Sequence, residues 1–282
     1  MQIELVDTFL DLVETRSFNR TAERLGVTQS TVSGRVAALE AAVGARLFDR
    51  SRAGTDLTAE GARFEAHARS LRHTWAEAQR AVAHSGKAAA VLRIGIQHDL
   101  AAGQMGDWVQ AFRQALPDYA FYIECDYSPQ MCIEVERGTL DFAVLYTPYP
   151  HPDLHFASTG EIAYVLVSSD GETRASLRPD RYVRGSFAPA FDAAHRAALP
   201  EMADAPVGSG ANTAIAGLLT TLGGAGFVLE ETADALAPQG FRRVADVAPI
   251  SQPIFACVHM RHRSNPVHRR LTRIVGAQLG AV

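Results

Sequence analysis

The sequence lacks several features that would assign it to a class at once. It contains three cysteines (Cys125, Cys132 and Cys257) and no C-x-x-C pair, so neither a disulfide framework nor a zinc site is expected, and structural thiols are favoured over a redox sensor. No apolar run reaches the roughly 18 residues of a membrane span, and the N-terminus is acidic and amphipathic, unlike a signal peptide. We therefore expect a cytoplasmic protein with no membrane partner.

The chain also lacks a surplus of positive charge, because 27 basic side chains stand against 31 acidic ones and Lys87 is the one lysine. The balance differs along the chain. Residues 1–90 hold twelve basic and eleven acidic side chains, whereas the remainder holds fifteen and twenty. The acidity belongs mainly to the second part, so the net charge of -4 does not exclude a nucleic-acid partner for the first. The length of 282 residues and an ordinary globular composition suggest two domains.

The N-terminal block is predicted to form three short helices. Apolar residues keep helical spacing over the first turns and give way to a polar run that ends at Ser17. Ser17 and Thr28 carry side-chain oxygens that can cap the helices after them, so we expect helices at about 18–25 and 29–42. Gly26 lies in the short turn between these two helices, where a left-handed conformation is needed.

A long helix is expected next. No proline occurs from residue 58 to about 85, and apolar residues advance by alternating steps of four and three: Leu57, Gly61, Phe64, Ala68, Leu71, Trp75, Ala78 and Val82. This heptad seam predicts a helix that pairs with another helix. The alternative is a long helix that lies on its own domain. A hinge is expected at 85–90.

From residue 91 onward, apolar strand-like runs alternate with helix candidates. We expect strands at 91–96, 121–125, 142–145, 163–167, 226–229 and 254–259, and helices at 103–115, 129–138, 212–222 and 267–279. This order predicts a mostly parallel sheet covered on both faces. In such sheets ligands bind beyond the carboxyl ends of the strands, beside helix N-termini.

The segment 21–33 has the spacing of a helix-turn-helix. Ala22 allows close helix crossing, Gly26 suits the turn, and Val32 packs the third helix against the second. The outward residues of the third helix can donate and accept hydrogen bonds at base edges and phosphates: Gln29, Ser30, Thr31, Ser33 and Arg35. The alternative is a solvated polar face of a small helical domain.

These residues strongly resemble the LysR-type transcriptional regulators. The match is dense over residues 1–61 and is carried by Thr15-Arg16-Ser17-Phe18, Ala22-Glu23-Arg24-Leu25, Thr28-Gln29-Ser30-Thr31-Val32-Ser33, Ala38-Leu39-Glu40, Gly44, Leu47-Phe48-Asp49-Arg50 and Leu57-Thr58-Ala59-Glu60-Gly61. The later segments agree in order and length, so the resemblance covers the whole chain. It implies a bacterial, sequence-specific DNA-binding regulator of transcription, with double-stranded promoter DNA, a small-molecule effector and RNA polymerase as partners.

The resemblance also implies where DNA is contacted. Thr28, Gln29, Ser30, Thr31 and Ser33 match the face of the recognition helix, which enters the major groove with its N-terminal end. Arg35 matches a phosphate or base contact. Arg50 and Arg52 match the wing, which approaches the flanking minor groove. Residues 16–58 hold seven basic and four acidic side chains, a modest surplus, so we expect affinity to depend on two or more bound copies.

For the second part, the resemblance implies a two-lobed effector-binding domain with the ligand in the cleft. Turns after the strands and one helix N-terminus supply the candidate contacts: Gln97, His98, Asp99, Tyr127, Ser128, Tyr146, Thr147, Ser209, Gly210, Asn212 and Thr213. Hydroxyl residues commonly dominate the first of these turns in the family, whereas this chain has His98 and Asp99. Because Asp99 and Asp126 would repel a carboxylate, we expect a neutral, aromatic or amino-bearing effector. An empty vestigial cleft is the alternative.

Enzyme and metal-site motifs do not fit. Gly86-Lys87 lacks the residues of a phosphate-binding loop, and Gly208-Ser209-Gly210 is not a nucleophile elbow. His259 and His262 have no acidic neighbour, so they are not expected to hold a metal. His98 and Asp99 face no identifiable nucleophile. We expect neither catalytic activity nor a cofactor.

The expected fold is α plus α/β. It comprises a winged helix-turn-helix (1–58), a linker and dimerisation helix with its hinge (59–90) and a two-lobed domain like a periplasmic binding protein (91–282). Lobe I is expected at about 91–161 and 263–282, and lobe II at about 162–262. Linker helices are expected to pair two chains and effector domains to pair the pairs into a homotetramer. The alternative is a small-molecule binding protein whose helical N-terminus associates with protein rather than DNA.

Two kinds of substitution should affect DNA binding differently. Arg50→Ala or Arg52→Ala is expected to weaken binding to all sequences and to flatten its salt dependence, because a phosphate-type contact is lost. Gln29→Ala should instead change which sequences are preferred, because its amide would contact base edges. Binding-site selection with each variant measures the difference, and an unchanged preference in Gln29→Ala would contradict this register.

Overall fold

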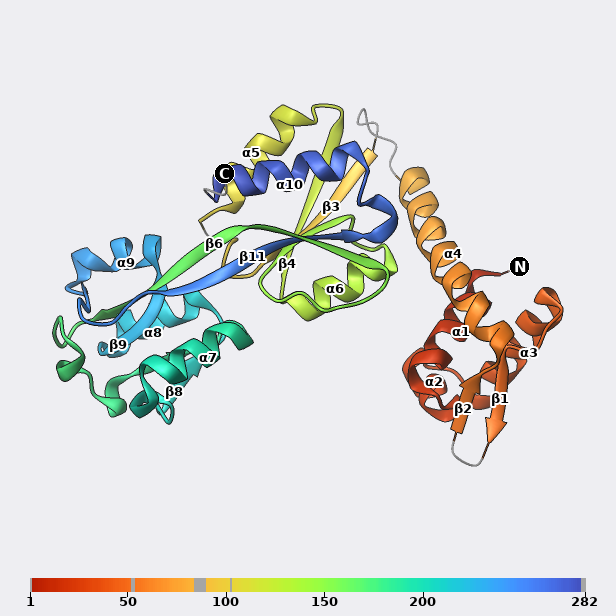
Figure 1. Ribbon diagram of the computed structural model, residues 1–282, viewed down its shortest axis with the longest axis horizontal. Coiled ribbons are helices and arrows are strands. Elements are labelled where there is room, and N and C mark those ends of the chain that lie inside the picture. The colour runs from red at the N-terminus through yellow and green to blue at the C-terminus, as the bar shows by residue number, and fades with distance from the viewer. Residues whose placement is uncertain (1, 52–53, 84–89, 102, 280–282) are drawn as a thin grey trace. The chain divides into compact units, whose positions relative to one another are not determined.

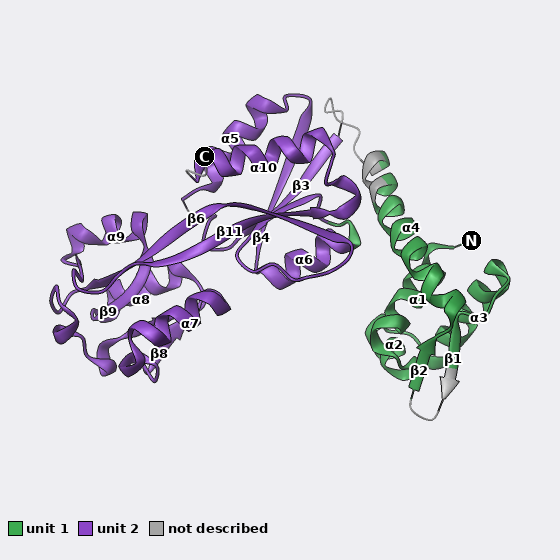
Figure 2. Ribbon diagram, viewed as in Figure 1, with its two compact units in different colours: residues 1–86, 137–139 green, residues 87–136, 140–282 purple. Residues whose placement is uncertain are grey.

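The structure is a computed structural model that describes residues 2–51, 54–83, 90–101 and 103–279. It divides into two compact units, of residues 1–86 with 137–139 and residues 87–136 with 140–282 (Figure 2). We refer to them as unit 1 and unit 2. Residues 85–89 of the predicted hinge at 85–90 lie outside the described residues. Within the described part, no helix combines the length and the hydropathy needed to cross a membrane.

Unit 1 opens with three helices, α1 (Ile3–Thr15), α2 (Phe18–Leu25) and α3 (Gln29–Val43) (Figure 1). The predicted caps are confirmed. The Ser17 hydroxyl accepts from the backbone N–H of Arg20 at 3.4 Å, and the Thr28 hydroxyl accepts from that of Thr31 at 3.2 Å. Gly26 ends α2 with φ +64°. This left-handed conformation costs glycine little, because glycine has no Cβ. Local capping chemistry therefore sets where α2 begins and ends and where α3 begins.

The three helices enclose an apolar core with a small hairpin beside it. Val32, Val36 and Leu39 of α3 are buried in this core, and the ring of Phe9 lies 5.2 Å from that of Phe48. Phe48 begins β1 (Phe48–Ser51), which pairs antiparallel with β2 (Gly54–Leu57). Helix-turn-helix and hairpin therefore form one packed body, as expected for a winged helix.

The long helix α4 (Ala59–Ala83) follows the hairpin, and its apolar seam divides into two parts. Ala68 is fully buried, and a Cβ at Gly61 would collide with the backbone carbonyl of Leu47, so the N-terminal part packs on its own domain. Farther along, Trp75 is 47% exposed and Val82 is 86% exposed. Each of the two interpretations of the seam therefore fits one part of the helix.

Unit 2 is a mixed α/β domain. Its strands are β3 (Ala90–Gln97), β4 (Tyr119–Asp126), β5 (Phe142–Leu145), β6 (Leu154–Ser168), β7 (Val183–Gly185), β8 (Val207–Ser209), β9 (Ala225–Leu229), β10 (Arg242–Arg243) and β11 (Ile250–His259). Its α-helices are α5 (Met105–Ala115), α6 (Ser128–Arg137), α7 (Pro189–Ala198), α8 (Asn212–Leu222), α9 (Glu230–Leu236) and α10 (Pro266–Gln278). All six strands and four helices expected from the sequence are present, and nine of these ten elements match within four residues at each end. The exception is β6, which begins at Leu154 rather than at the predicted residue 163. Helices α7 and α9 and the short strands were not foreseen.

The prediction of a mostly parallel sheet was wrong. The main sheet has the order β10-β6-β11-β5-β3-β4, with β9 paired to β6. Only the β3–β4 and β3–β5 pairs are parallel in its described part, while β6 and β11 run antiparallel along their length. The apolar runs revealed where strands lie but not their direction, because direction depends on pairing between distant segments.

The strands β6 and β11 are shared by two groups of elements (Figure 1). We call β3–β5 with α5, α6 and α10 the first half of unit 2, and β7–β10 with α7–α9 the second half. β11 pairs with β5 of the first half, and β6 pairs with β9 of the second half. The segments that leave β3 and β5 therefore approach the second half beside the shared strands.

Candidate functional site

The N-terminal end of α3 presents a polar surface. Thr28, Gln29, Ser30 and Thr31 are exposed, and Ser33 is half-buried. The Thr28 hydroxyl lies 2.8 Å from both the Ser30 and Thr31 hydroxyl oxygens, so the first turn carries a cluster of adjacent hydroxyl groups. These groups project from a helix whose opposite face is fixed in the core, which is the arrangement needed to present hydrogen-bonding groups to a groove.

The candidate arginines lie in different environments. Arg35 is half-buried, and its Nη1 donates to the Thr8 hydroxyl of α1 at 3.3 Å, so this side chain contacts α1 as well as the surface of α3. Arg50 belongs to β1, but its side chain lies outside the described residues, as does the whole of Arg52. Their expected contacts with DNA stay predictions.

Glu40 connects the recognition helix to the hairpin. Its Oε1 accepts from the backbone N–H of Leu47 at 2.7 Å and of Phe48 at 3.3 Å. The chain enters β1 at these residues, so a single carboxylate on α3 fixes where the hairpin begins. Charged acceptors make hydrogen bonds stronger than neutral ones do, which suits a contact that sets the position of one DNA-contacting element relative to another.

Several effector candidates in unit 2 hydrogen-bond to one another. Ser128 is buried at the start of α6, and its hydroxyl donates to Gln97 Oε1 at 2.8 Å. The same oxygen accepts from the backbone N–H of Tyr146 at 3.0 Å and of Thr147 at 3.1 Å. Gln97 and Tyr146 are buried as well. These residues therefore hold together the ends of β3, β4 and β5.

Asp99 makes the corresponding connection to the second half. Its Oδ1 accepts from the backbone N–H of Asn212 at 2.7 Å, and its Oδ2 accepts from the Tyr164 hydroxyl at 3.0 Å. The Tyr146 and Tyr164 hydroxyl oxygens lie 3.1 Å apart. Burial raises the pKa of Asp99 above its ordinary value, and the bonds from Asn212 and Tyr164 oppose that rise. Burial also raises the pKa of both tyrosines, so both hydroxyls keep their protons.

The other candidates are accessible. His98 and Thr213 are exposed, Tyr127 is 45% exposed, and Ser209 and Gly210 are half-buried. The rings of His98 and Tyr127 lie 5.9 Å apart. A Cβ at Gly210 would lie 3.8 Å from the Tyr127 hydroxyl, which places the end of the β8 loop near this aromatic pair. The structure thus separates a buried, hydrogen-bonded set of candidates from an accessible set.

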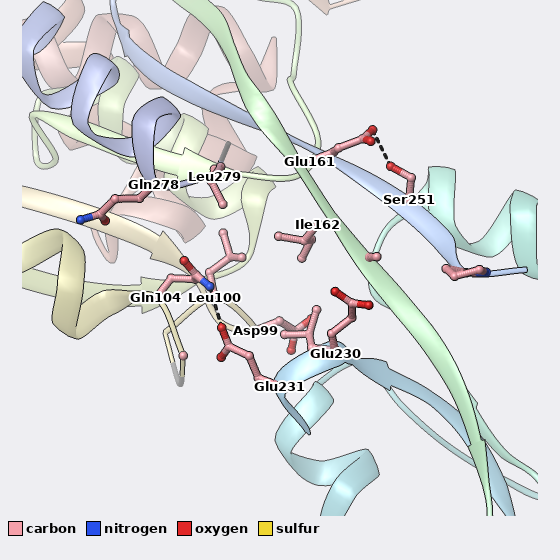
Figure 3. Close-up of a pocket in the computed structure, with 14 residues that line it drawn as sticks. Asp99, Leu100, Gln104, Glu161, Ile162, Glu230, Glu231, Ser251, Gln278 and Leu279 are labelled. Carbon is pink, nitrogen blue, oxygen red and sulfur yellow. Dashed lines mark hydrogen bonds between the residues drawn. The ribbon is translucent and has the colours of Figure 1, made fainter. Parts of the chain in front are cut away.

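A pocket of about 380 Å³ lies against the shared strands (Figure 3). Asp99 is the one effector candidate that lines it in the described structure. Its other polar lining residues were not predicted from the sequence: Gln104, Glu161, Glu230, Glu231, Ser251 and Gln278. Glu231 accepts from Gln104 Nε2 at 2.9 Å, and Glu161 accepts from the Ser251 hydroxyl at 2.6 Å. Glu230 and Glu231 directly follow a predicted strand, a signal that could have identified them.

The carboxylates make this pocket acidic. Of the residues that the structure describes, four acidic ones and no basic one line it. Arg243, outside the lining, approaches Glu230 at 3.2 Å and partly offsets its charge. Such a lining favours a group that carries positive charge or donates hydrogen bonds and disfavours a carboxylate. Among the described residues, no group of three or more His, Cys, Asp or Glu side chains is placed to hold a metal ion.

Two family models match the chain and together span most of it. Residues 3–62 match the bacterial regulatory helix-turn-helix protein of the lysR family, and residues 85–280 match the LysR substrate binding domain. The chain belongs to the LysR family of transcriptional regulators. This LysR-type regulator therefore binds DNA through unit 1 and carries an effector-binding domain in unit 2, and its family comprises transcriptional regulators rather than enzymes.

Curated relatives of this LysR-type regulator include transcriptional regulators named HdfR. The protein of Salmonella newport is 29% identical over 263 residues, which is 91% of each chain. That of Yersinia enterocolitica is 32% identical over 169 residues, which is 60% of this chain and 57% of the relative. These matches agree with the family assignment.

Solved structures support the fold of this LysR-type regulator. ArgP from Mycobacterium tuberculosis has a TM-score of 0.60 at 23% identity and covers 99% of this chain and 97% of its own. LysG from Corynebacterium glutamicum, solved with its effector Arg bound, has a TM-score of 0.56 at 20% identity, with 99% of each chain covered. DarR from Vibrio fischeri, solved in complex with DNA, has a TM-score of 0.56 at 18% identity, covering 100% of this chain and 99% of its own.

Removing the Ser128 hydroxyl should destabilise unit 2 of this LysR-type regulator. Ser128→Ala leaves the buried Tyr146 N–H and the partly buried Thr147 N–H without their acceptor, which costs about 1–3 kcal/mol. Urea unfolding in a Trp75→Phe background measures this loss, because Trp108, the remaining tryptophan, is buried in unit 2. Thr213→Ala, at an exposed position, is the control and should change the free energy of unfolding by less than about 0.5 kcal/mol. Equal stability of the two variants would contradict the structural role of Ser128.

Proposed function

We propose that this regulator reads promoter DNA with the exposed first turn of α3 in the major groove. The observation that carries this proposal is the exposed hydroxyl and amide surface of Thr28–Thr31 on a helix whose other face is packed in the core. Glu40 holds the hairpin to the same helix, so the arginines of the wing would follow the recognition helix onto the flanking minor groove. A gel shift on promoter fragments with competitor DNA at two salt concentrations tests this arrangement.

We further infer a division of 1–58 for DNA binding, 59–90 for dimerisation, and 91–282 for effector binding. The lobes would comprise about 91–161 with 263–282, and about 162–262. This division is supported by the pairing of β11 with β5 at one end and of β6 with β9 at the other.

The exposed part of α4 is the proposed dimer contact. Beside the N-terminal turn of α1 it forms a groove of about 440 Å³ whose apolar lining includes Ile3, Leu71, Trp75 and Ala78. A large exposed aromatic side chain next to such a groove favours association, because pairing two copies would remove apolar surface from water. Two chains paired in this way would present two DNA-binding heads, and pairing through effector domains would give a homotetramer.

A charge placed in this groove should disrupt the dimer. Trp75→Glu is expected to shift the protein toward monomers and to weaken promoter binding by about tenfold or more, because two linked heads bind more tightly than one. Analytical ultracentrifugation and a gel shift measure the two effects. Ala66→Glu, exposed on the opposite side of the heptad pattern, is the matched control and should change neither. A Trp75→Glu variant that dimerises like the wild type would contradict this interface.

The effector is proposed to be amino-bearing. The acidic lining by Asp99, Glu161, Glu230 and Glu231 supports a ligand with a positively charged nitrogen over a carboxylate. An effector that prefers one arrangement of the two lobes would shift the spacing of the DNA-binding heads and so the bend of the promoter. Footprints and bend angles that do not change on addition of a proven effector would contradict this mechanism.

A thermal-shift screen tests the class of effector. Cationic amines such as arginine, lysine and putrescine are compared with neutral aromatics and dicarboxylates at matched ionic strength. At 100 times its Kd a ligand adds about 2.7 kcal/mol of stability, which is about 5–10 °C in Tm for a domain of this size. Glu231→Gln should reduce the response to the amines, because it removes a charge from the pocket. Stabilisation by dicarboxylates alone would contradict the proposal.

A further inference from the structure

The segment after β3 reaches across to the first turn of α8. Asp99 is 2% exposed, and Asn212, the first residue of α8, is also 2% exposed. The 2.7 Å contact between Asp99 Oδ1 and the Asn212 N–H is therefore a charge-assisted hydrogen bond made away from water. It connects residues 113 positions apart in the chain, one from each half of unit 2.

The second oxygen of Asp99 is occupied as well. Tyr164 of β6 donates to Oδ2 at 3.0 Å, and its own oxygen lies 3.1 Å from the Tyr146 hydroxyl. Because the Tyr164 hydroxyl gives its proton to the Asp99 carboxylate, the Tyr146 hydroxyl must be the donor to the Tyr164 oxygen. The hydrogen bonds therefore run from Tyr146 through Tyr164 to Asp99. Asn212 is fixed in turn, because its Oδ1 accepts from the Leu229 N–H at 2.9 Å. Each partner of the carboxylate is thus held by a further contact.

This arrangement resembles the binding of a small carboxylate by a protein. The N-terminus of a helix offers unpaired N–H groups and a partial positive charge, and it commonly binds an external anion. Here an anionic side chain of the same protein already occupies that position. A second carboxylate could not approach without strong repulsion at such a short distance in a buried environment.

We propose that Asp99 acts as a built-in carboxylate ligand that ties the two halves of unit 2 together at the first turn of α8 without any added anion. This inference does not depend on DNA binding or on the identity of the effector. It assigns Asp99 to positioning the two halves, so that the pocket beside it is left to Glu161, Glu230 and Glu231 for contact with a bound molecule.

A second contact between the halves lies nearby and is exposed to solvent. Glu231 of α9 accepts from Gln104 Nε2 at 2.9 Å, in an exposed position, and its carboxylate approaches Gly103 so closely that a Cβ there would collide with it. Exposed contacts of this kind contribute little, because water competes for the same groups. Glu231 therefore provides a matched control, since it bridges the same two halves of unit 2 from the surface.

Chemical rescue tests the proposal on the full-length protein. Asp99→Ala leaves a cavity lined by the Asn212 N–H and the Tyr164 hydroxyl, and it should lower Tm by about 3–8 °C. Acetate or formate at 100 mM should restore about 2–4 °C of that loss relative to sodium chloride of equal ionic strength, because a small carboxylate can enter the cavity. The wild type should show no such difference between the salts.

Two further variants distinguish the contact of Asp99 with the first turn of α8 from a general salt effect and from the loss of an exposed contact. Asp99→Asn fills the same space and keeps an acceptor for Asn212, so acetate should not stabilise it beyond chloride. Glu231→Ala should lose less than about 2 °C and should also show no acetate response. If Asp99→Ala does not fold during expression, the yield of refolding from urea in acetate against chloride measures the same rescue.

Three results would overturn the proposal. The first is an Asp99→Ala variant as stable as the wild type. The second is an acetate effect no larger than that of chloride on Asp99→Ala, in Tm or in refolding yield. The third is a loss in Glu231→Ala equal to that in Asp99→Ala. A specific rescue of Asp99→Ala by acetate or formate, absent from the other proteins, supports the tie.

Discussion

Polar groups that are buried where β3, β4 and β5 end must find partners inside the protein, and the arrangement of unit 2 depends on this requirement. Ser128 satisfies two backbone N–H groups and binds Gln97, while Asp99 satisfies the first N–H of α8. A buried donor without an acceptor costs about 1–3 kcal/mol, a large share of the stability of a domain. The segments between strands and helices are therefore positioned as firmly as the sheet itself.

The same requirement decides which polar residues remain available for function. Gln97 ends a strand, and Ser128 and Tyr146 follow strands, as ligand-binding residues commonly do, yet their hydrogen-bonding groups are engaged with one another. The pocket uses acidic side chains from β6 and the start of α9 instead. In unit 1 the division is simpler, because the first turn of α3 is open while Val32 and Val36 anchor the helix.

Local features were predicted well, and features that depend on distant pairing were not. Ser17, Gly26 and Thr28 act within a few residues of their own position, so the ends of α2 and α3 followed from the sequence. The antiparallel course of β6 and β11 joins segments about 100 residues apart and has no local signature. Helix α7 was missed although Pro189 stands in its first turn, and Glu161 was missed because it lies within a strand.

The sequence by itself determined the family, the winged helix-turn-helix and the polar face of α3, because capping, helical periodicity and turn glycines are encoded by neighbouring residues. Only the tertiary structure decided which part of the α4 seam is exposed and which strand-end residues are buried. It also decided that Asp99 faces the first turn of α8 rather than solvent. The physical reason is that burial and hydrogen-bond partners are properties of segments brought together from distant parts of the chain, and no local pattern records which segments meet.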